Sequence, residues 1–98
     1  MITYKIIITA KADEDERSTY NYIAGNFGEI YAQQFRTKTL EVFEKLCKYP
    51  FIGRVAKNSN RLRVLIFNKQ NKIIYKVTET DVIIVRILNT KTNLSSKY

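Results

Sequence analysis

Lysine and arginine are the side chains in this sequence that could do chemistry. The stretch "RLRVLIFNKQNKIIYKV", residues 61–77, carries no acid but holds five cations, which are Arg61, Arg63, Lys69, Lys72 and Lys76. Such groups bind phosphates and stabilise negative charge that develops in a transition state. The chain has no histidine and a single cysteine, Cys47. This composition argues against a metal site and against any mechanism that needs an imidazole base, so we expect no metal and no cofactor.

The positive charge is concentrated in the second half of the chain. The formal net charge is +8, from 17 basic and 9 acidic residues. Residues 1–50 hold seven cations and seven anions, whereas residues 51–98 hold ten cations and two anions. A one-sided basic half is typical of a protein that binds a polyanion or an acidic protein. The alternative is a charge that serves only solubility.

A length of 98 residues predicts one domain, residues 1–98, with a single modest core. One cysteine cannot form an internal disulfide and fits a reducing compartment. The N-terminal "MITYKIIITA" has only three consecutive isoleucines, next to Lys5, and matches neither a signal peptide nor a membrane span. We therefore expect a cytoplasmic protein that does not enter a membrane.

Two helices and four strands are predicted to position the basic residues. Residues 4–9 are β-branched and aromatic, which indicates a strand. Thr9 can cap a helix whose first turns are acidic and which ends at Gly25 to Gly28. This first helix has a thin apolar stripe with Glu16 inside it. A second helix over 29–48 has a clear stripe at three- and four-residue spacing, formed by Ala32, Phe35, Thr39, Val42, Phe43, Leu46 and Cys47.

The remaining strands are predicted over 61–67, 72–78 and 82–88, with "NKQN" as the first turn. This pairing sets Leu65 opposite Ile74, and a three-residue connection over 79–81 keeps Arg86 out of the core. One face then collects Leu62, Val64, Ile66, Ile73, Tyr75, Val77, Ile83, Val85 and Ile87. We predict an α+β domain in the order strand, two helices and three antiparallel strands, with both helices on that face. The residues expected to be buried between helices and sheet include Phe35, Phe43, Leu46, Tyr75 and Val85.

The opposite face of the predicted sheet is both apolar and basic. It sets Arg61, Arg63, Lys72, Lys76 and Arg86 around Leu65, Phe67 and Ile74. Such a face is too apolar for a purely solvated surface and too charged for a core, which is typical of a binding surface. The alternative is that a tail or a neighbouring subunit covers it.

Several segments in this order resemble the RelE/ParE family of toxins from bacterial toxin–antitoxin modules. The matching segments are "YKIIITAKADED", "YNYIAGNFGEIYAQQF", "FEKLCKYPFIGR", "KIIYKV" and "VIIVRILNTKTN". Among their most specific features are Pro50 followed by Gly53 and Arg54, and the stretch from Asn89 to Asn93. Glu16 departs from the family pattern, which usually has an apolar residue at that position.

The resemblance implies one of two activities. RelE-like members look like ribosome-dependent mRNA endonucleases that work without a metal or histidine, and for that activity the matching residues would be Arg63, Lys72, Lys91 and Tyr98. ParE-like members look like poisons that bind DNA gyrase without chemistry of their own, and the target contacts would then be Arg86, Lys91 and Asn93. Leu65 stands where the nucleases have a second sheet lysine. This departure, with the position of Tyr98 at the end of the chain, favours the ParE-like branch.

In either branch the resemblance implies a toxin that inhibits growth, as in plasmid stabilisation or stress, and a cognate antitoxin as partner. The antitoxin is expected on Arg61, Arg63, Leu65, Phe67 and Ile74, because an acidic or amphipathic segment would cover the basic face. A homodimer of the free toxin is a further option. The remaining alternative is a small basic nucleic-acid-binding module with no toxic role, for which affinity would fall steeply with salt.

Overall fold

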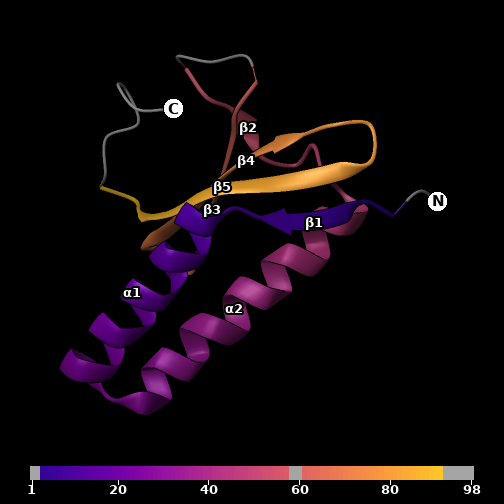
Figure 1. The fold of residues 1–98 in the computed structure, drawn as a ribbon. Coiled ribbons are helices and arrows are strands. Elements are labelled where there is room, and N and C mark those ends of the chain that lie inside the picture. Colours follow the sequence, from indigo (N-terminus) through magenta and orange to yellow (C-terminus); the bar gives the residue numbers. More distant parts are fainter. Residues whose placement is uncertain (1–2, 58–60, 92–98) are drawn as a thin grey trace.

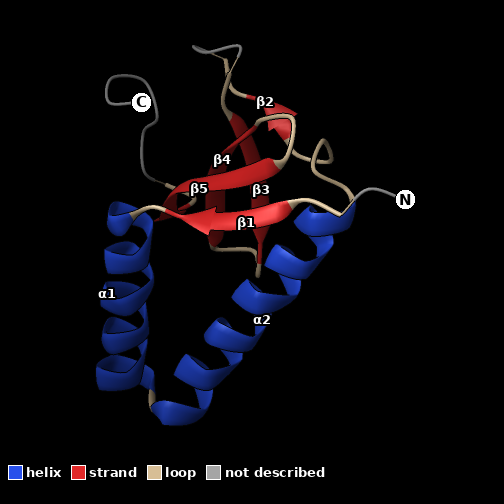
Figure 2. Ribbon diagram, turned by 45° about the vertical axis from the view of Figure 1, so that its right-hand side comes forward, coloured by secondary structure: helices blue, strands red, loops and turns tan. Residues whose placement is uncertain are grey.

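Two antiparallel helices cover one face of a five-stranded mixed sheet (Figure 1, Figure 2). The computed structural model describes residues 3–57 and 61–91. Along the chain the elements are β1 (Lys5–Ile8), α1 (Ala10–Phe27), α2 (Glu29–Lys48), β2 (Arg54–Val55), β3 (Arg63–Phe67), β4 (Asn71–Val77) and β5 (Asp81–Asn89). The predicted α+β class and element order are confirmed, and β2 is a short additional strand. Within the described ranges, neither helix has the length and apolar character needed to cross a membrane.

The strand order of the sheet is β1-β5-β4-β3-β2. β1 runs parallel to β5, and all other neighbours are antiparallel. The N-terminal strand therefore lies beside the C-terminal strand, and β1 and β2 form the two edges of the sheet.

Local capping explains the helical hairpin. The Thr9 hydroxyl accepts a hydrogen bond from the Ala12 N–H at 3.1 Å, as predicted for an N-cap, and donates to the Val85 carbonyl oxygen at 3.1 Å. Gly28 joins α1 to α2 at φ 101°, a conformation that favours glycine. Gly25 lies inside α1 rather than at its end, because the helix continues to Phe27.

An ion pair explains the acidic residue in the apolar stripe of α1. Glu16 accepts hydrogen bonds from the guanidinium of Arg36 on α2, with Nε 3.1 Å from Oε2. The same guanidinium lies 3.9 Å from the centre of the Tyr20 ring. The two helices are therefore joined by a cation–π contact and a part-buried ion pair as well as by apolar packing.

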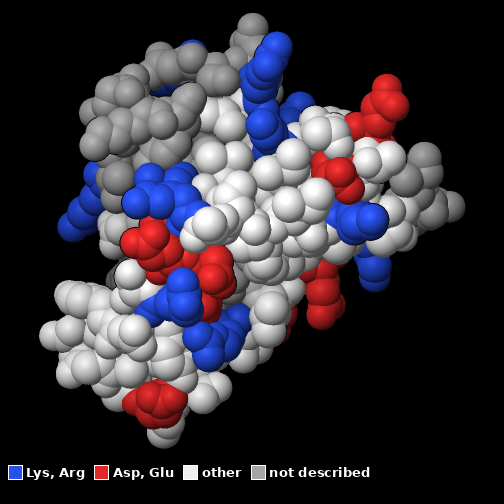
Figure 3. Space-filling view, in the orientation of Figure 1, with Lys and Arg blue, Asp and Glu red and all other residues white. Residues whose placement is uncertain are grey.

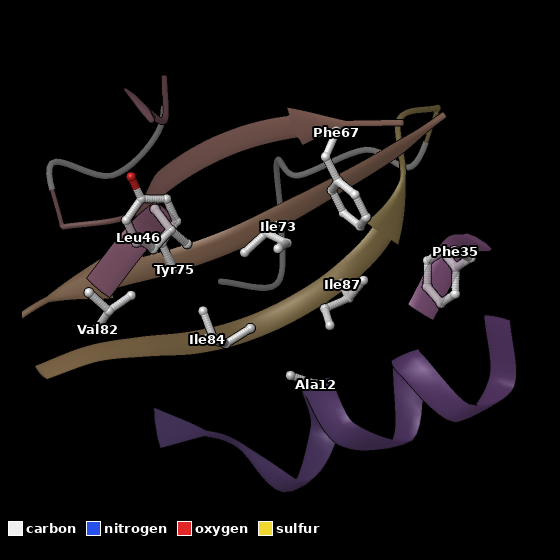
Figure 4. Packing of buried hydrophobic residues seen from close by; sticks show 9 residues of the cluster. All are labelled: Ala12, Phe35, Leu46, Phe67, Ile73, Tyr75, Val82, Ile84 and Ile87. Carbon is white, nitrogen blue, oxygen red and sulfur yellow. The ribbon is translucent and has the colours of Figure 1, made fainter. Parts of the chain in front are cut away.

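The main core lies between the helices and the sheet (Figure 4). Its buried members are Ala12, Phe35, Leu46, Phe67, Ile73, Tyr75, Val82, Ile84 and Ile87. Burial of Phe35, Leu46 and Tyr75 is confirmed. Phe43 is only partly buried and packs against this core. The prediction for Val85 is wrong, because it packs on a different cluster.

The register of the β3–β4 hairpin differs from the prediction by one residue. The turn has three residues, 68–70, instead of four, and its backbone has positive φ at Asn68 and Lys69. Leu65 therefore lies opposite Ile73, not Ile74. A shift of one residue moves every side chain of a strand to the other face, so Leu65 and Phe67 point toward the helices.

A β-bulge in β5 also changes the predicted faces. The Thr78 N–H donates to the backbone carbonyl oxygen of Asp81, and Val77 pairs with Val82, so the β4–β5 connection does not have the predicted register. The register shifts between Ile74 and Tyr75, which pair with Arg86 and Ile84, and Val85 is the extra residue. Consequently Val82 and Ile84, not Ile83 and Val85, join Ile87 in the core.

Candidate functional site

The predicted basic and apolar face does not form as expected. Leu65 and Phe67 belong to the helix side of the sheet, where Phe67 stacks on Phe35 with ring centres 6.2 Å apart. Ile74 does lie on the opposite side, but it is completely buried there. It belongs to a second cluster with Ala56, Leu62 and Val64, against which Val85 and Leu88 pack. Phe67 and Ile74 are therefore not exposed anchors for a partner.

Arg63 is bound to the turn that follows α2. Its Nη1 donates hydrogen bonds to the carbonyl oxygens of Gly53, at 2.8 Å, and Phe51, at 3.3 Å. The guanidinium also lies 5.0 Å from the centre of the Phe51 ring. The Gly53 N–H in turn donates to the buried hydroxyl of Tyr75 at 2.8 Å. Arg63 thus holds the chain between α2 and β2, whereas Arg61, two residues earlier, is exposed.

Lys72 is almost completely buried, with 6% of its surface exposed. Its Nζ donates to the Thr90 carbonyl oxygen at 3.4 Å, just beyond the end of β5. Burial lowers the pKa of the Lys72 ammonium group, and the nearby positive charge of Arg54 lowers it further. An ammonium group in this position holds the end of β5.

Arg86 forms a two-pronged ion pair with Asp15 of α1. Its Nε lies 2.6 Å from Oδ2 and its Nη2 lies 2.9 Å from Oδ1. The Ile87 N–H donates to the same carboxylate at 3.1 Å. The side chains are only 19% and 13% exposed. Figure 3 shows acidic and basic atoms next to one another where α1 meets the sheet. Arg86 therefore connects α1 to β5.

Of the predicted nuclease residues that the structure describes, Lys72 binds the residue before Lys91, whereas Arg63 binds a different segment of the chain. Arg63 binds at residues 51–53, whereas Lys72 binds at Thr90. Lys91 is exposed, and its N–H donates to the Asn89 side-chain oxygen at 2.9 Å. Asn93 and Tyr98 lie outside the described residues. Across the described ranges, no group of three or more histidine, cysteine, aspartate or glutamate side chains could hold a metal ion.

An apolar surface that was not predicted from the sequence lies at the closed end of the helical hairpin. Tyr22, Phe27, Ile30 and Tyr31 are each more than half exposed, and the Tyr22 and Phe27 rings meet edge to face at 6.4 Å. This end of the molecule is mostly uncharged on the face shown in Figure 3. The signal was in "YNYIAGNFGEIY", where large apolar residues fall outside the buried stripes of both helices.

A groove adjoins this apolar surface. It has a volume of about 560 Å³ and separates the hairpin from the β3–β4 turn. Tyr22, Phe27 and Tyr31 line one wall, and the turn residues 68–70 line the other. Among the described residues that line it, Lys69 alone is charged. The groove can therefore accept an amphipathic segment, with apolar contacts on one side and hydrogen bonds to amide side chains on the other.

The comparisons with known proteins agree with this fold. The family model described as "ParE toxin of type II toxin-antitoxin system, parDE" matches residues 6–94. A solved structure entitled "Chromosomal ParDE TA system from P. aeruginosa" is similar over 91% of this chain and 98% of that one, with a TM-score of 0.79 and 18% sequence identity. Comparison with curated protein sequences gives no match. The structural likeness shows a shared fold. Because the family model spans nearly the whole chain, this protein belongs to the ParE family of toxins of type II toxin–antitoxin systems.

Proposed function

We propose that this protein is a cytoplasmic toxin that arrests growth by binding DNA gyrase and is held inactive by a cognate antitoxin. The observation that carries the proposal is the match of the ParE toxin family model to residues 6–94. Gyrase is the target that the resemblance to ParE-like poisons implies. Membership of a toxin family also disfavours the alternative of a nucleic-acid-binding module with no toxic role.

The geometry of the basic residues supports a poison over an mRNA endonuclease of RelE type. A nuclease that relies on cations must direct several of them at one phosphate, because preorganised charge is what stabilises the transition state. Here the Arg63 guanidinium is occupied by two backbone carbonyls, and the buried Lys72 ammonium donates to Thr90. A protein that acts by binding needs no such convergence.

The proposed target-binding segment follows β5. Of the three residues expected to contact the target, Arg86 is engaged by Asp15 inside the fold. Lys91 is exposed beyond the last strand, and Asn93 follows it in the sequence. We therefore assign the gyrase contacts to Lys91 and Asn93 and not to Arg86.

The antitoxin is proposed to cover the closed end of the helical hairpin and its groove. A contiguous apolar surface on a small protein commonly marks a binding site. The exposed side chains of Tyr22, Phe27 and Tyr31 offer aromatic anchors of the kind that dominate interface energetics. Alternatively, two copies of the free toxin could associate through the same surface at the closed end of the helical hairpin.

Induced expression in a bacterial host tests the proposal. We expect growth arrest with a DNA-damage response and intact mRNA, since a trapped gyrase damages DNA. Co-expression of the antitoxin encoded beside the toxin gene should restore growth. A Lys91→Glu variant should arrest growth less, whereas Lys38→Glu, an equal charge change on α2, should behave like the wild type. Growth arrest with cleaved mRNA and no DNA-damage response would favour the nuclease.

A further inference from the structure

The two edges of the sheet differ in charge. Between Lys48, the end of α2, and Glu79 the chain has no acidic residue but seven cations, and this stretch includes β2, β3 and β4. The β2 edge therefore belongs to the basic part of the molecule. The opposite edge, β1, lies beside a groove in which the acidic side chain of Glu16 is paired with Arg36. An incoming acidic segment would therefore be attracted more strongly to the β2 edge than to the β1 edge, where the charges are balanced.

The backbone of β2 is arranged to accept another strand. Arg54 pairs with Val64 and Val55 with Arg63, and the Ala56 N–H donates to the Leu62 carbonyl oxygen at 2.8 Å. Bonded and non-bonded pairs alternate in an antiparallel ladder, so the N–H and C=O of Val55 point away from β3. Among the elements that the structure describes, none pairs with this outer edge. An unpaired strand edge is a template for addition of a further strand.

The side chains of β2 present a different chemistry on each face of the sheet. Arg54 lies opposite Val64, which faces away from the helices, and it is close enough to Lys72 for its charge to lower the pKa of that ammonium group. Val55 lies opposite Arg63 on the other face and is 44% exposed. Two neighbouring apolar side chains, Phe51 and Ile52, are also exposed. A strand beside β2 would thus meet Arg54 on one face and apolar groups on the other.

We propose that β2 is a docking edge for an extended segment of the antitoxin in which acidic and apolar residues alternate. This inference rests on the proposed function for the identity of the partner. Main-chain hydrogen bonds to Val55 would provide affinity, and carboxylates beside Arg54 would provide specificity. A nucleic acid is disfavoured because it cannot continue a β-ladder and gains little from the exposed valine, phenylalanine and isoleucine. The segment would extend the contact that the antitoxin makes at the helical hairpin.

The affinity of the purified antitoxin for toxin variants tests this edge. Arg54→Glu reverses the charge, and Val55→Pro removes the outward N–H without removing a β2–β3 hydrogen bond. Each should weaken binding by about tenfold or more, as expected for the loss of a central charge pair or strand contact. Lys11→Glu, the same charge change at an exposed position of α1, should stay within about twofold of the wild type. Arg54→Glu leaves the backbone intact and so remains informative if the proline variant does not fold.

Hydrogen exchange on the wild-type complex gives an independent result. The Val55 amide should exchange more slowly in the complex than in the free toxin. Equal exchange in both states, or unchanged affinity of Arg54→Glu, would overturn the proposal. So would an Arg54→Glu variant that loses affinity only for an oligonucleotide. If the wild type does not arrest growth but its Val55 amide is protected by the antitoxin, the docking edge stands and the proposed toxicity fails.

Discussion

Arg63, which the sequence offered as a residue that could bind phosphate, instead forms hydrogen bonds within the fold. Its guanidinium binds the carbonyls of Phe51 and Gly53, and the Gly53 N–H is bound by Tyr75. The sequence shows that the cations are there and that few acids are near them. It does not show that backbone carbonyls of a distant turn will be their partners, because those contacts depend on tertiary structure.

Gly53 is expected to tolerate no side chain. A Cβ atom at this position would lie 2.6 Å from the Tyr75 hydroxyl oxygen and 2.9 Å from the Val64 carbonyl oxygen. Gly53→Ala should therefore lower the free energy of unfolding by about 1–3 kcal/mol, measured by urea denaturation. Gly25→Ala is the control, since nothing lies within 4 Å of its Cβ position inside α1. It should raise stability by about 0.5–1 kcal/mol. Similar effects of the two substitutions would contradict the packing described for Gly53.

The buried Tyr75 hydroxyl predicts a pH dependence of stability. Burial raises the pKa of Tyr75 above 10.0, although the Gly53 N–H and Arg63 oppose this shift. Because the folded pKa is higher than the unfolded one, the neutral phenol contributes stability that is fully present below pH 10 and is lost as the pH rises through the folded pKa. Tyr75→Phe should cost about 1–3 kcal/mol at neutral pH, where it leaves the Gly53 N–H without a partner.

Thermal unfolding of both proteins between pH 7 and about pH 11 measures this effect. The difference in stability between wild type and Tyr75→Phe should narrow above pH 10. Lys72, whose pKa is lowered, is present in both proteins and does not enter the difference. A constant difference across the range would show that Tyr75 does not titrate differently in the folded state.

At the scale of elements, the helices could be predicted because their signals are local. The Thr9 cap and the apolar stripe of α2 require no knowledge of the rest of the fold. Strand register could not be fixed in this way. The "NKQN" turn can close with three or four residues, and the bulge at Val85 depends on how β5 packs against α1. A difference of one residue moved Leu65 and Phe67 from the predicted binding face into the core.

Leu46 connects α2 to the sheet and should be one of the most sensitive apolar residues of that helix. Its side chain is fully buried beside Tyr75 (Figure 4). Leu46→Ala should lower the free energy of unfolding by about 2–5 kcal/mol, because a cavity would remain. Leu40→Ala, on the exposed side of the same helix, should cost less than about 1 kcal/mol. If urea denaturation gave equal losses of stability for Leu46→Ala and Leu40→Ala, the assigned orientation of α2 would be contradicted.

The Asp15–Arg86 pair should hold α1 on the sheet. Asp15→Asn removes the charge from a carboxylate that accepts three hydrogen bonds, from Nε and Nη2 of Arg86 and from the Ile87 N–H. A loss of about 2–4 kcal/mol is expected, since a mostly buried cation would lose its counter-ion. Asp13→Asn breaks an exposed pair with Arg17 and should change stability by less than about 1 kcal/mol. If Asp15→Asn changed stability as little as Asp13→Asn, the Asp15–Arg86 pair would contribute no more than an exposed ion pair.

At the scale of the whole molecule, the uneven distribution of charge along the chain was predicted from the sequence. The positions of the basic side chains on the folded surface were not. The composition shows that residues 51–98 carry all of the net charge. Three of the cations assigned to binding, Arg63, Lys72 and Arg86, have partners inside the fold. The apolar surface at the hairpin end was missed because exposure is a property of the assembled chain. A periodic pattern identifies which residues a helix can bury, not which large side chains remain outside.

We propose that the protein acts by binding gyrase and not by cutting mRNA. The most direct measurement titrates purified toxin into a DNA supercoiling reaction of purified gyrase, with translating ribosomes and mRNA treated in parallel. We expect supercoiling to be inhibited, with full inhibition retained when Tyr98 is deleted, and the mRNA to remain intact. Undiminished supercoiling together with mRNA cleavage that the Tyr98 deletion abolishes would contradict the account.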